Sequence, residues 1–145
     1  MKTNEISNSQ DVIDSRDVME RLEELQAERD ELLNESEDEE KTKDEIEEAK
    51  KALTEWDEEN GEELEALQKL EEEASGAADW QYGETLIRES YFTEYCEELC
   101  KDIGDIPKDL PWYIADNIDW DGVADAIKAD YTEVDFDGVT YYMRA

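Results

Sequence analysis

The sequence predicts an α+β fold that is mostly α, with an N-terminal helical hairpin or coiled coil followed by a small helical domain closed by a C-terminal β-hairpin. Apolar residues recur at heptad-like spacing from residue 18 to residue 74, which indicates helices packed along one seam. Every aromatic residue except Trp56 lies from Trp80 onward, so the C-terminal half has the side chains for a packed core. Asp137-Gly138 is the strongest short hairpin signal in the chain.

The first helix is expected to follow a flexible N-terminus over residues 1–14. Asp14 or Ser15 can cap it, and Arg29 fills one gap in a seam with steps of four and three residues. The apolar members of this seam are Val18, Leu22, Leu25 and Leu32. Residues 34–38 contain no apolar side chain, which predicts a turn there.

A second, longer helix should start at Thr42, because Thr42 and Glu45 have the spacing of a capping box. Asn60-Gly61 is a candidate break in this helix. Its seam residues are Ile46, Ala49, Leu53, Trp56, Leu64, Leu67, Leu70 and Ala74. Residues 15–76 are therefore expected to form an acidic coiled-coil helical hairpin, and the pattern leaves open whether the helices pair within one chain or between two.

Small, uncharged residues at 75–78 mark the expected boundary to a small α+β domain over residues 79–145. A third helix is predicted over residues 84–102, with Gly104 at the position of a left-handed C-cap. Two prolines then open a short helix through residues 112–114. Asp119 or Asp121 should cap the next helix, and the chain should end in a β-hairpin around Asp137-Gly138.

Charge dominates the composition. The 145 residues include 46 acids, 14 bases and no histidine, for a formal net charge of −32. A chain this negative repels nucleic acid and anionic membrane surfaces, so neither is expected as a direct partner. Without histidine, no Ser/His or Cys/His nucleophile pair can form, so we expect a protein that is not an enzyme and needs no cofactor. The N-terminus lacks a signal-peptide pattern, which favours a cytoplasmic protein.

Two motifs that resemble functional sites are interpreted as structural features. Cys96 and Cys100 are four residues apart on one helical face, which is poor geometry for a disulfide, so we expect two reduced thiols. Residues 117–122 imitate the first half of an EF-hand loop. The twelfth position of that frame is Lys128, where calcium needs a bidentate glutamate, so a capped turn is expected and no metal.

The distribution of acids points to function. Residues 35–73 contain 19 acids and 5 bases, and the segments on either side are also acidic, so the charge is not a detachable tail. As helix, these residues span about 58 Å with one acid about every 3 Å. Duplex DNA carries one charge per about 1.7 Å of axis, a density that two acidic helices side by side approach. This comparison favours DNA mimicry over a coiled-coil scaffold that is acidic only for solubility.

A resemblance adds to this interpretation. The motifs concerned are Gly104-Asp105-Ile106-Pro107, Tyr113-Ile114 and Ile118-Asp119-Trp120, followed by the Asp137-Gly138 hairpin. Over roughly residues 88–143, the chain resembles the last domain of ArdA-type antirestriction proteins. Two departures are an insertion between the second and third of these motifs and a heptad hairpin in place of the family's first two domains. The resemblance implies a dimeric DNA mimic, carried by a phage or plasmid, that inhibits type I restriction enzymes in a bacterial host cell.

The sequence thus predicts an inhibitor that competes with DNA for the basic groove of a type I restriction-modification enzyme. The alternatives are an anti-CRISPR protein that blocks the nucleic-acid channel of a CRISPR effector, and the acidic scaffold. We expect a homodimer, because the seam of the first helix is short and an isolated pair of such helices is marginal. The candidate partner-binding surface consists of Glu47, Glu48, Glu58, Glu62, Glu65, Asp116, Asp119, Asp121 and Asp125.

Overall fold

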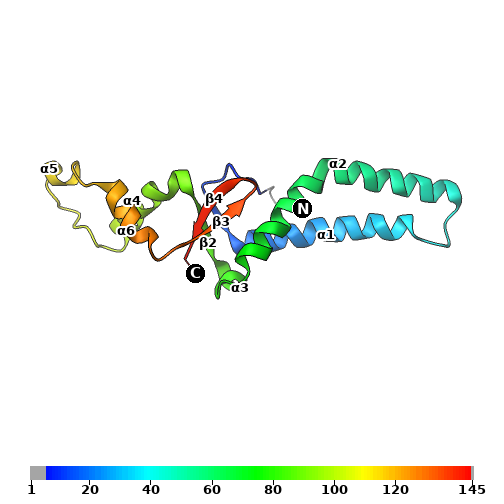
Figure 1. The fold of residues 1–145 in the computed structure, drawn as a ribbon, viewed down its shortest axis with the longest axis horizontal. Coiled ribbons are helices and arrows are strands. Elements are labelled where there is room, and N and C mark those ends of the chain that lie inside the picture. The colour runs from blue at the N-terminus through cyan, green and yellow to red at the C-terminus, as the bar shows by residue number, and fades with distance from the viewer. Residues whose placement is uncertain (1–5, 145) are drawn as a thin grey trace.

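The computed structural model describes residues 6–144 and shows an elongated molecule with a sheet at its centre (Figure 1). One arm, the hairpin arm, consists of α1 (Ser15–Ser36) and α2 (Lys43–Ala74). The opposite arm, here the second arm, contains α4 (Phe92–Asp102), α5 (Trp112–Ala115) and α6 (Trp120–Lys128). Short α3 (Trp80–Gly83) and η1 (Glu89–Tyr91) flank strand β2. The predicted class, α+β and mostly α, is confirmed.

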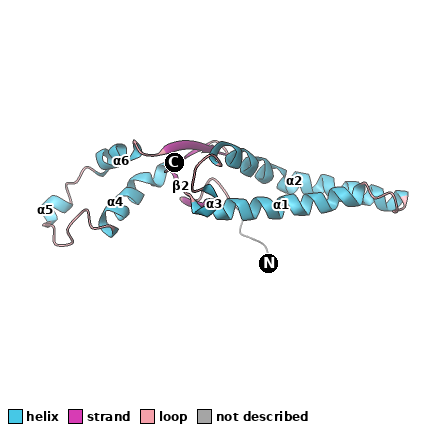
Figure 2. Ribbon diagram, turned by 90° about the horizontal axis from the view of Figure 1, so that it is seen from below, coloured by secondary structure: helices cyan, strands magenta, loops and turns pink. Residues whose placement is uncertain are grey.

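The sheet is antiparallel throughout, with the strand order β1-β2-β4-β3. Its strands are β1 (Val12–Asp14), β2 (Thr85–Arg88), β3 (Thr132–Phe136) and β4 (Val139–Met143). The predicted C-terminal hairpin is confirmed, with Asp137 and Gly138 at φ 50° and 82°. Two successive positive φ values are the signature of a type I′ turn, which matches the natural twist of paired strands. In Figure 2 the sheet lies between the two arms.

The prediction of a flexible N-terminus is wrong for residues 6–14, the part of that segment that the structure describes. Ile6 is 5% exposed and lies in the core, and residues 12–14 form the edge strand β1. Ile13 pairs with Leu86, more than seventy positions later in the chain, so the partner that orders this segment is invisible in its local pattern. Residues 1–5, which belonged to the same expectation, lie outside the described residues.

The third predicted helix begins later than expected. Residues 85–88 form strand β2, and α4 begins only at Phe92. The reason is that Leu86 and Ile87 are both buried, at 0% and 1% exposure, although they are adjacent. In a strand, neighbouring side chains point to opposite faces, so each of the two enters a different core.

The two long helices form an antiparallel hairpin within one chain, which answers the question that the heptad pattern left open. The predicted capping box is present, since the Thr42 hydroxyl accepts from the Glu45 backbone N–H and the Glu45 side chain accepts from the Thr42 backbone. The expected break at Asn60-Gly61 is wrong, because α2 runs through both residues. Arg29 occupies the seam as predicted and pairs with Asp57 at 2.9 Å.

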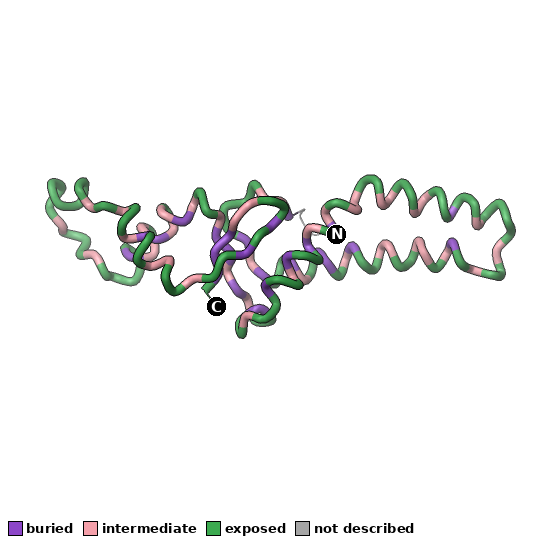
Figure 3. The backbone as a smooth tube through the Cα atoms, viewed as in Figure 1, coloured by how far each residue is buried: buried purple, intermediate pink, exposed green. Residues whose placement is uncertain are grey.

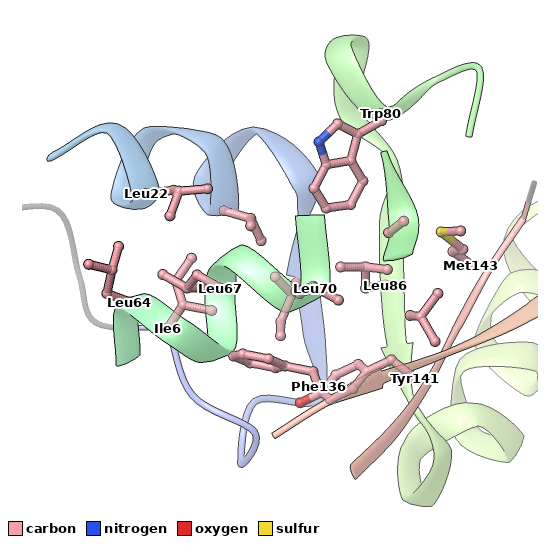
Figure 4. Packing of buried hydrophobic residues seen from close by; sticks show 14 of the residues in the cluster. Ile6, Leu22, Leu64, Leu67, Leu70, Trp80, Leu86, Phe136, Tyr141 and Met143 are labelled. Carbon is pink, nitrogen blue, oxygen red and sulfur yellow. The ribbon is translucent and has the colours of Figure 1, made fainter. Parts of the chain in front are cut away.

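The core has two parts, one on each face of the sheet. The larger part joins the inner half of the hairpin arm to the sheet, so that Leu67 and Leu70 meet Leu86, Phe136 and Tyr141 (Figure 4). The smaller part packs α4 and α6 against the other face through Ile87, Phe92, Cys96, Ala124 and Tyr142. The hairpin and the C-terminal residues therefore share one core across the predicted boundary at residues 75–78.

Burial falls off along both arms. In Figure 3 buried residues gather at the centre, whereas the ends of the arms are mostly exposed. Beyond Leu25, the outer half of the hairpin arm keeps its seam residues Leu32, Leu53 and Trp56 only half-buried. In this part of the arm α1 and α2 pack against each other, so much of their remaining surface faces solvent. That surface carries acidic residues.

Candidate acidic interface

All nine sequence-predicted acidic residues are exposed, but they lie in two separate groups. Five project from α2 on the hairpin arm, and four lie on the second arm in or beside α5 and α6. The central sheet separates the groups, so they occupy opposite parts of the molecule (Figure 1). The structure therefore does not join them into one patch, and a partner that touches both must contact the molecule along its length.

The group on α2 forms a stripe that faces away from the core. At about 3.6 residues per turn, Glu47, Glu58, Glu62 and Glu65 lie within about 60° of one another around the helix axis. The buried residues of α2 (Ala49, Leu64, Leu67, Leu70 and Ala74) cluster on the other side. We call these four glutamates the α2 stripe. Because the seam must face α1, the acids at these positions are directed to solvent.

The group on the second arm is tied to local structure. Asp119 is the N-cap of α6, and its carboxylate accepts from the Gly122 backbone N–H at 3.1 Å, which confirms the predicted capped turn. Asp121 accepts from the Thr93 hydroxyl at 3.3 Å, and Asp125 pairs with Lys128 at 3.5 Å. Asp116 follows the last residue of α5. These carboxylates remain exposed while they cap or pair, so they stay available to a partner.

The structure adds acids that sequence reasoning missed. An open groove of about 680 Å³ lies between the C-terminal half of α2 and the β3–β4 hairpin. Besides the predicted Glu62 and Glu65, its charged lining consists of Glu72, Glu73, Asp135, Asp137 and Lys69. The Asp135 backbone N–H donates to the Glu73 carboxylate at 3.3 Å and so links the two elements. The triple glutamate at residues 71–73 was the available signal, but its proximity to residue 135 depends on the fold.

Two arginines of the hairpin arm, Arg21 and Arg29, form ion pairs between α1 and α2. Arg21 is 8% exposed and donates to Glu63 at 2.7 Å and to Glu24 at 2.9 Å. These hydrogen bonds, with Glu63 the stronger influence, raise the pKa of Arg21 despite its burial. Arg29 spans the seam to Asp57 farther out. These two cations neutralise acids between the helices and not the outer face, where Lys69 pairs with Glu65 of the α2 stripe at 3.1 Å.

The two cysteine thiols are further groups that could react or bind a metal ion. Cys96 and Cys100 are free thiols, as predicted, and both are buried. Burial raises the pKa of Cys96 to about 11, so its thiol stays protonated and unreactive at neutral pH. Within residues 6–144, no three Cys, Asp or Glu side chains come together as a metal ion requires. None of the helices in that range is both long enough and apolar enough to cross a membrane.

Comparison with known proteins adds no identification. No family model matches the chain, and no curated protein or solved structure shows significant similarity to it. The resemblance of residues 88–143 to the ArdA C-terminal domain therefore stays a prediction.

Proposed function

We propose that this protein is a DNA mimic that inhibits a bacterial defence nuclease, with a type I restriction-modification enzyme as its target. The observation that carries the proposal is the α2 stripe, a row of exposed carboxylates opposite the packed seam of a 32-residue helix. At about 1.5 Å per residue this helix is about 48 Å long, which is more than the length of one turn of duplex DNA, about 34–36 Å.

The charge density supports competition with DNA. Helices α1 and α2 together contain 22 acids and 7 bases. Over about 48 Å, this is one net negative charge per about 3 Å, roughly half the density of duplex DNA. A mimic of lower density compensates with length, and acids on the groove, the sheet and the second arm continue the negative surface beyond α2.

The mechanism is electrostatic competition without catalysis. Carboxylates of the inhibitor occupy lysines and arginines that would otherwise neutralise phosphates, and the net charge of −32 steers association with a positive groove. Each exposed carboxylate contributes on the order of 1 kcal/mol or less, so the affinity is distributed over many residues. The resemblance of residues 88–143 to ArdA-type proteins supports the choice of target and a place of action in the bacterial cytoplasm.

The proposal is tested by titrating a purified type I modification methyltransferase with the protein at several salt concentrations, with duplex DNA as competitor. Changing the α2 stripe to glutamine (E47Q, E58Q, E62Q and E65Q together) should weaken binding by about 100-fold and flatten the dependence of log affinity on log salt. Glu58→Gln alone should change the affinity less than about 5-fold.

A matched variant tests the second arm. This variant has asparagine in place of Asp116, Asp119, Asp121 and Asp125, so it loses four negative charges, as the α2 stripe variant does. Asparagine at position 119 can still cap α6. If both arms contact the enzyme, this variant loses affinity and salt dependence as well. Binding that one single carboxylate controls, or binding that salt does not weaken, contradicts mimicry. Failure to bind the enzyme at all contradicts this choice of target and favours the two alternatives, the anti-CRISPR protein and the acidic scaffold.

A further inference from the structure

One end of this acidic molecule is apolar. Helix α5, at the tip of the second arm, exposes three consecutive large hydrophobic residues: Trp112 at 73%, Tyr113 at 58% and Ile114 at 48% (Figure 1). We call these three residues the aromatic tip. Among the described residues only three other large hydrophobic side chains are exposed, namely Val12, Tyr82 and Ile103. Exposed tryptophan and tyrosine side by side are typical of binding hot spots.

Hydrogen bonds order the backbone of the turn that bears the aromatic tip. Pro111 opens the turn, and its carbonyl accepts from the Ala115 N–H at 3.0 Å. The Trp112 carbonyl accepts from the Asp116 N–H at 2.8 Å, and the Asn117 side-chain amide donates to the Tyr113 carbonyl at 2.7 Å. The Trp112 and Tyr113 rings meet edge to face at 5.8 Å. A preordered apolar surface loses little entropy on binding, as a docking element requires.

A groove that is partly apolar adjoins the tip. It has a volume of about 510 Å³ and lies between α4 and the loop that bears α5. Its lining combines the apolar residues Ile106, Pro107, Leu110, Ile118 and Trp120 with the charged residues Glu97, Lys101, Asp102, Lys108 and Asp116. Since Leu110 and Ala115, which flank the aromatic tip in the chain, also line it, the apolar surface continues from the tip into the groove. A partner can therefore receive the projecting rings and place a side chain of its own beside them.

The surrounding charges define the partner. Over residues 102–118 the acids are Asp102, Asp105, Asp109 and Asp116, all exposed, and the base is Lys108. A second base of the groove, Lys101, pairs with Glu97 at 3.5 Å. These carboxylates repel phosphates, which argues against bases of a nucleic acid stacking on the rings. A symmetric contact between two tips would bring the same four acids together twice, which argues against a second copy. The charges fit an apolar pocket whose rim carries lysine or arginine.

We propose that the aromatic tip docks in an apolar pocket beside the basic DNA-binding groove of the target enzyme, an inference that rests on the proposed function. Duplex DNA presents no such apolar projection, so this contact gives the inhibitor an affinity that DNA cannot match. The acidic surface then attracts the inhibitor to the basic groove and raises the association rate. The tip adds an apolar contact that salt does not screen.

The test uses the same purified type I modification methyltransferase and compares Trp112→Ala/Tyr113→Ala with the wild type at several salt concentrations. The double variant should bind at least 10-fold more weakly at every salt concentration, with an unchanged slope of log affinity against log salt, because it removes no charge. Trp112→Phe should keep most of the affinity. Tyr82→Ala is the matched control, since Tyr82 is 76% exposed but lies on α3, away from the tip.

Each outcome decides the proposal. Unchanged affinity of the double variant, with wild-type folding by circular dichroism, overturns docking by the tip while leaving charge mimicry intact. Loss of self-association on removing the rings assigns the tip to a second copy, and quenching of Trp112 by a single-stranded oligonucleotide assigns it to nucleic acid. Either result overturns the proposal. If the wild-type protein does not bind the enzyme, the proposed function fails together with this inference.

Discussion

Arg21 shows at the scale of single residues how this chain tolerates its charge. Its guanidinium lies between α1 and α2, where it donates to Glu63 through two nitrogens at 2.7 and 2.9 Å. Arg21→Ala should lower the free energy of unfolding by about 3 kcal/mol, because Glu63 is left half-buried without its cation. Urea unfolding followed by circular dichroism measures this loss.

The control for Arg21 replaces both partners. Arg21→Met combined with Glu63→Met removes the ion pair without leaving the Glu63 carboxylate unpaired, so it should recover most of the lost stability. A loss of less than about 1 kcal/mol in Arg21→Ala would mean that solvent already screens the pair. The comparison separates the cost of an unpaired carboxylate from the value of the contact.

Glu84 is a second residue whose burial has a measurable effect. It is 6% exposed, and desolvation raises its pKa, although the Arg144 backbone N–H donates to its carboxylate at 3.2 Å. A raised pKa means that ionised Glu84 destabilises the folded state, and that this penalty disappears as pH falls through the folded-state pKa. Glu84→Gln should therefore melt at a higher temperature than the wild type at pH 7.

The difference between Glu84→Gln and the wild type should shrink as pH falls towards about 4.5, since protonated glutamate and glutamine have the same shape and charge. Melting both proteins at each pH removes the contribution of the other acids. A difference that is constant with pH would show that Glu84 gains no proton in the folded state over this range.

At the scale of elements, Gly61 and Gly104 are two glycines with different structural roles: the break predicted at Gly61 is absent, and the C-cap predicted at Gly104 is present. A Cβ added at either position meets nothing within 4 Å, but Gly61 lies in the middle of α2, whereas Gly104 has φ 82° after α4. The Asp105 N–H donates to the Cys100 carbonyl at 3.0 Å, which completes the C-cap that the sequence predicts.

Gly61→Ala should stabilise the protein by about 0.5–1 kcal/mol, because alanine favours helix and no neighbour opposes the added methyl. Gly104→Ala is the matched control and should destabilise by about 1 kcal/mol, because its left-handed conformation disfavours a Cβ. Thermal and urea unfolding measure both changes. Loss of stability in Gly61→Ala would indicate that a bend at this point of α2 matters to packing.

The whole molecule is governed by its summed charge. With a net charge of −32 and cations engaged in the hairpin seam, self-repulsion opposes the folded state. Added salt should stabilise by screening, and we expect the melting temperature to rise by roughly 5 °C between low salt and about 0.5 M NaCl. An equimolar neutral solute provides the control. A melting temperature that is flat or falls with salt would mean that local pairing already balances the charges.

The homodimer expected from the sequence stays a prediction at this scale. One chain has a mass of 16.9 kDa, so light scattering at micromolar concentration and moderate salt should report about twice that value. Since α1 and α2 fill each other's seam within one chain, a dimer must use another surface. A monomer mass under these conditions would contradict the prediction and would leave the acids on a single molecule to contact the enzyme.

The sequence by itself determined the features that depend on neighbouring residues. Heptad spacing placed the two long helices, the Thr42–Glu45 pair placed the start of the second, and Asp137-Gly138 placed the turn of the hairpin. The exposure of the nine candidate acids also followed, because charged residues opposite an apolar seam face solvent. In each case the physical cause lies within one helix or one turn.

Tertiary structure alone decided which distant segments meet. Strand β1 is three residues long and exists because Ile13 and Leu86 pair and enter one core, so no local period announces it. The groove between α2 and the β3–β4 hairpin joins Glu73 to Asp135 across about sixty residues of chain. The separation of the candidate acids into two groups has the same origin, because the sheet that divides them is assembled from residues 12–14, 85–88 and 132–143.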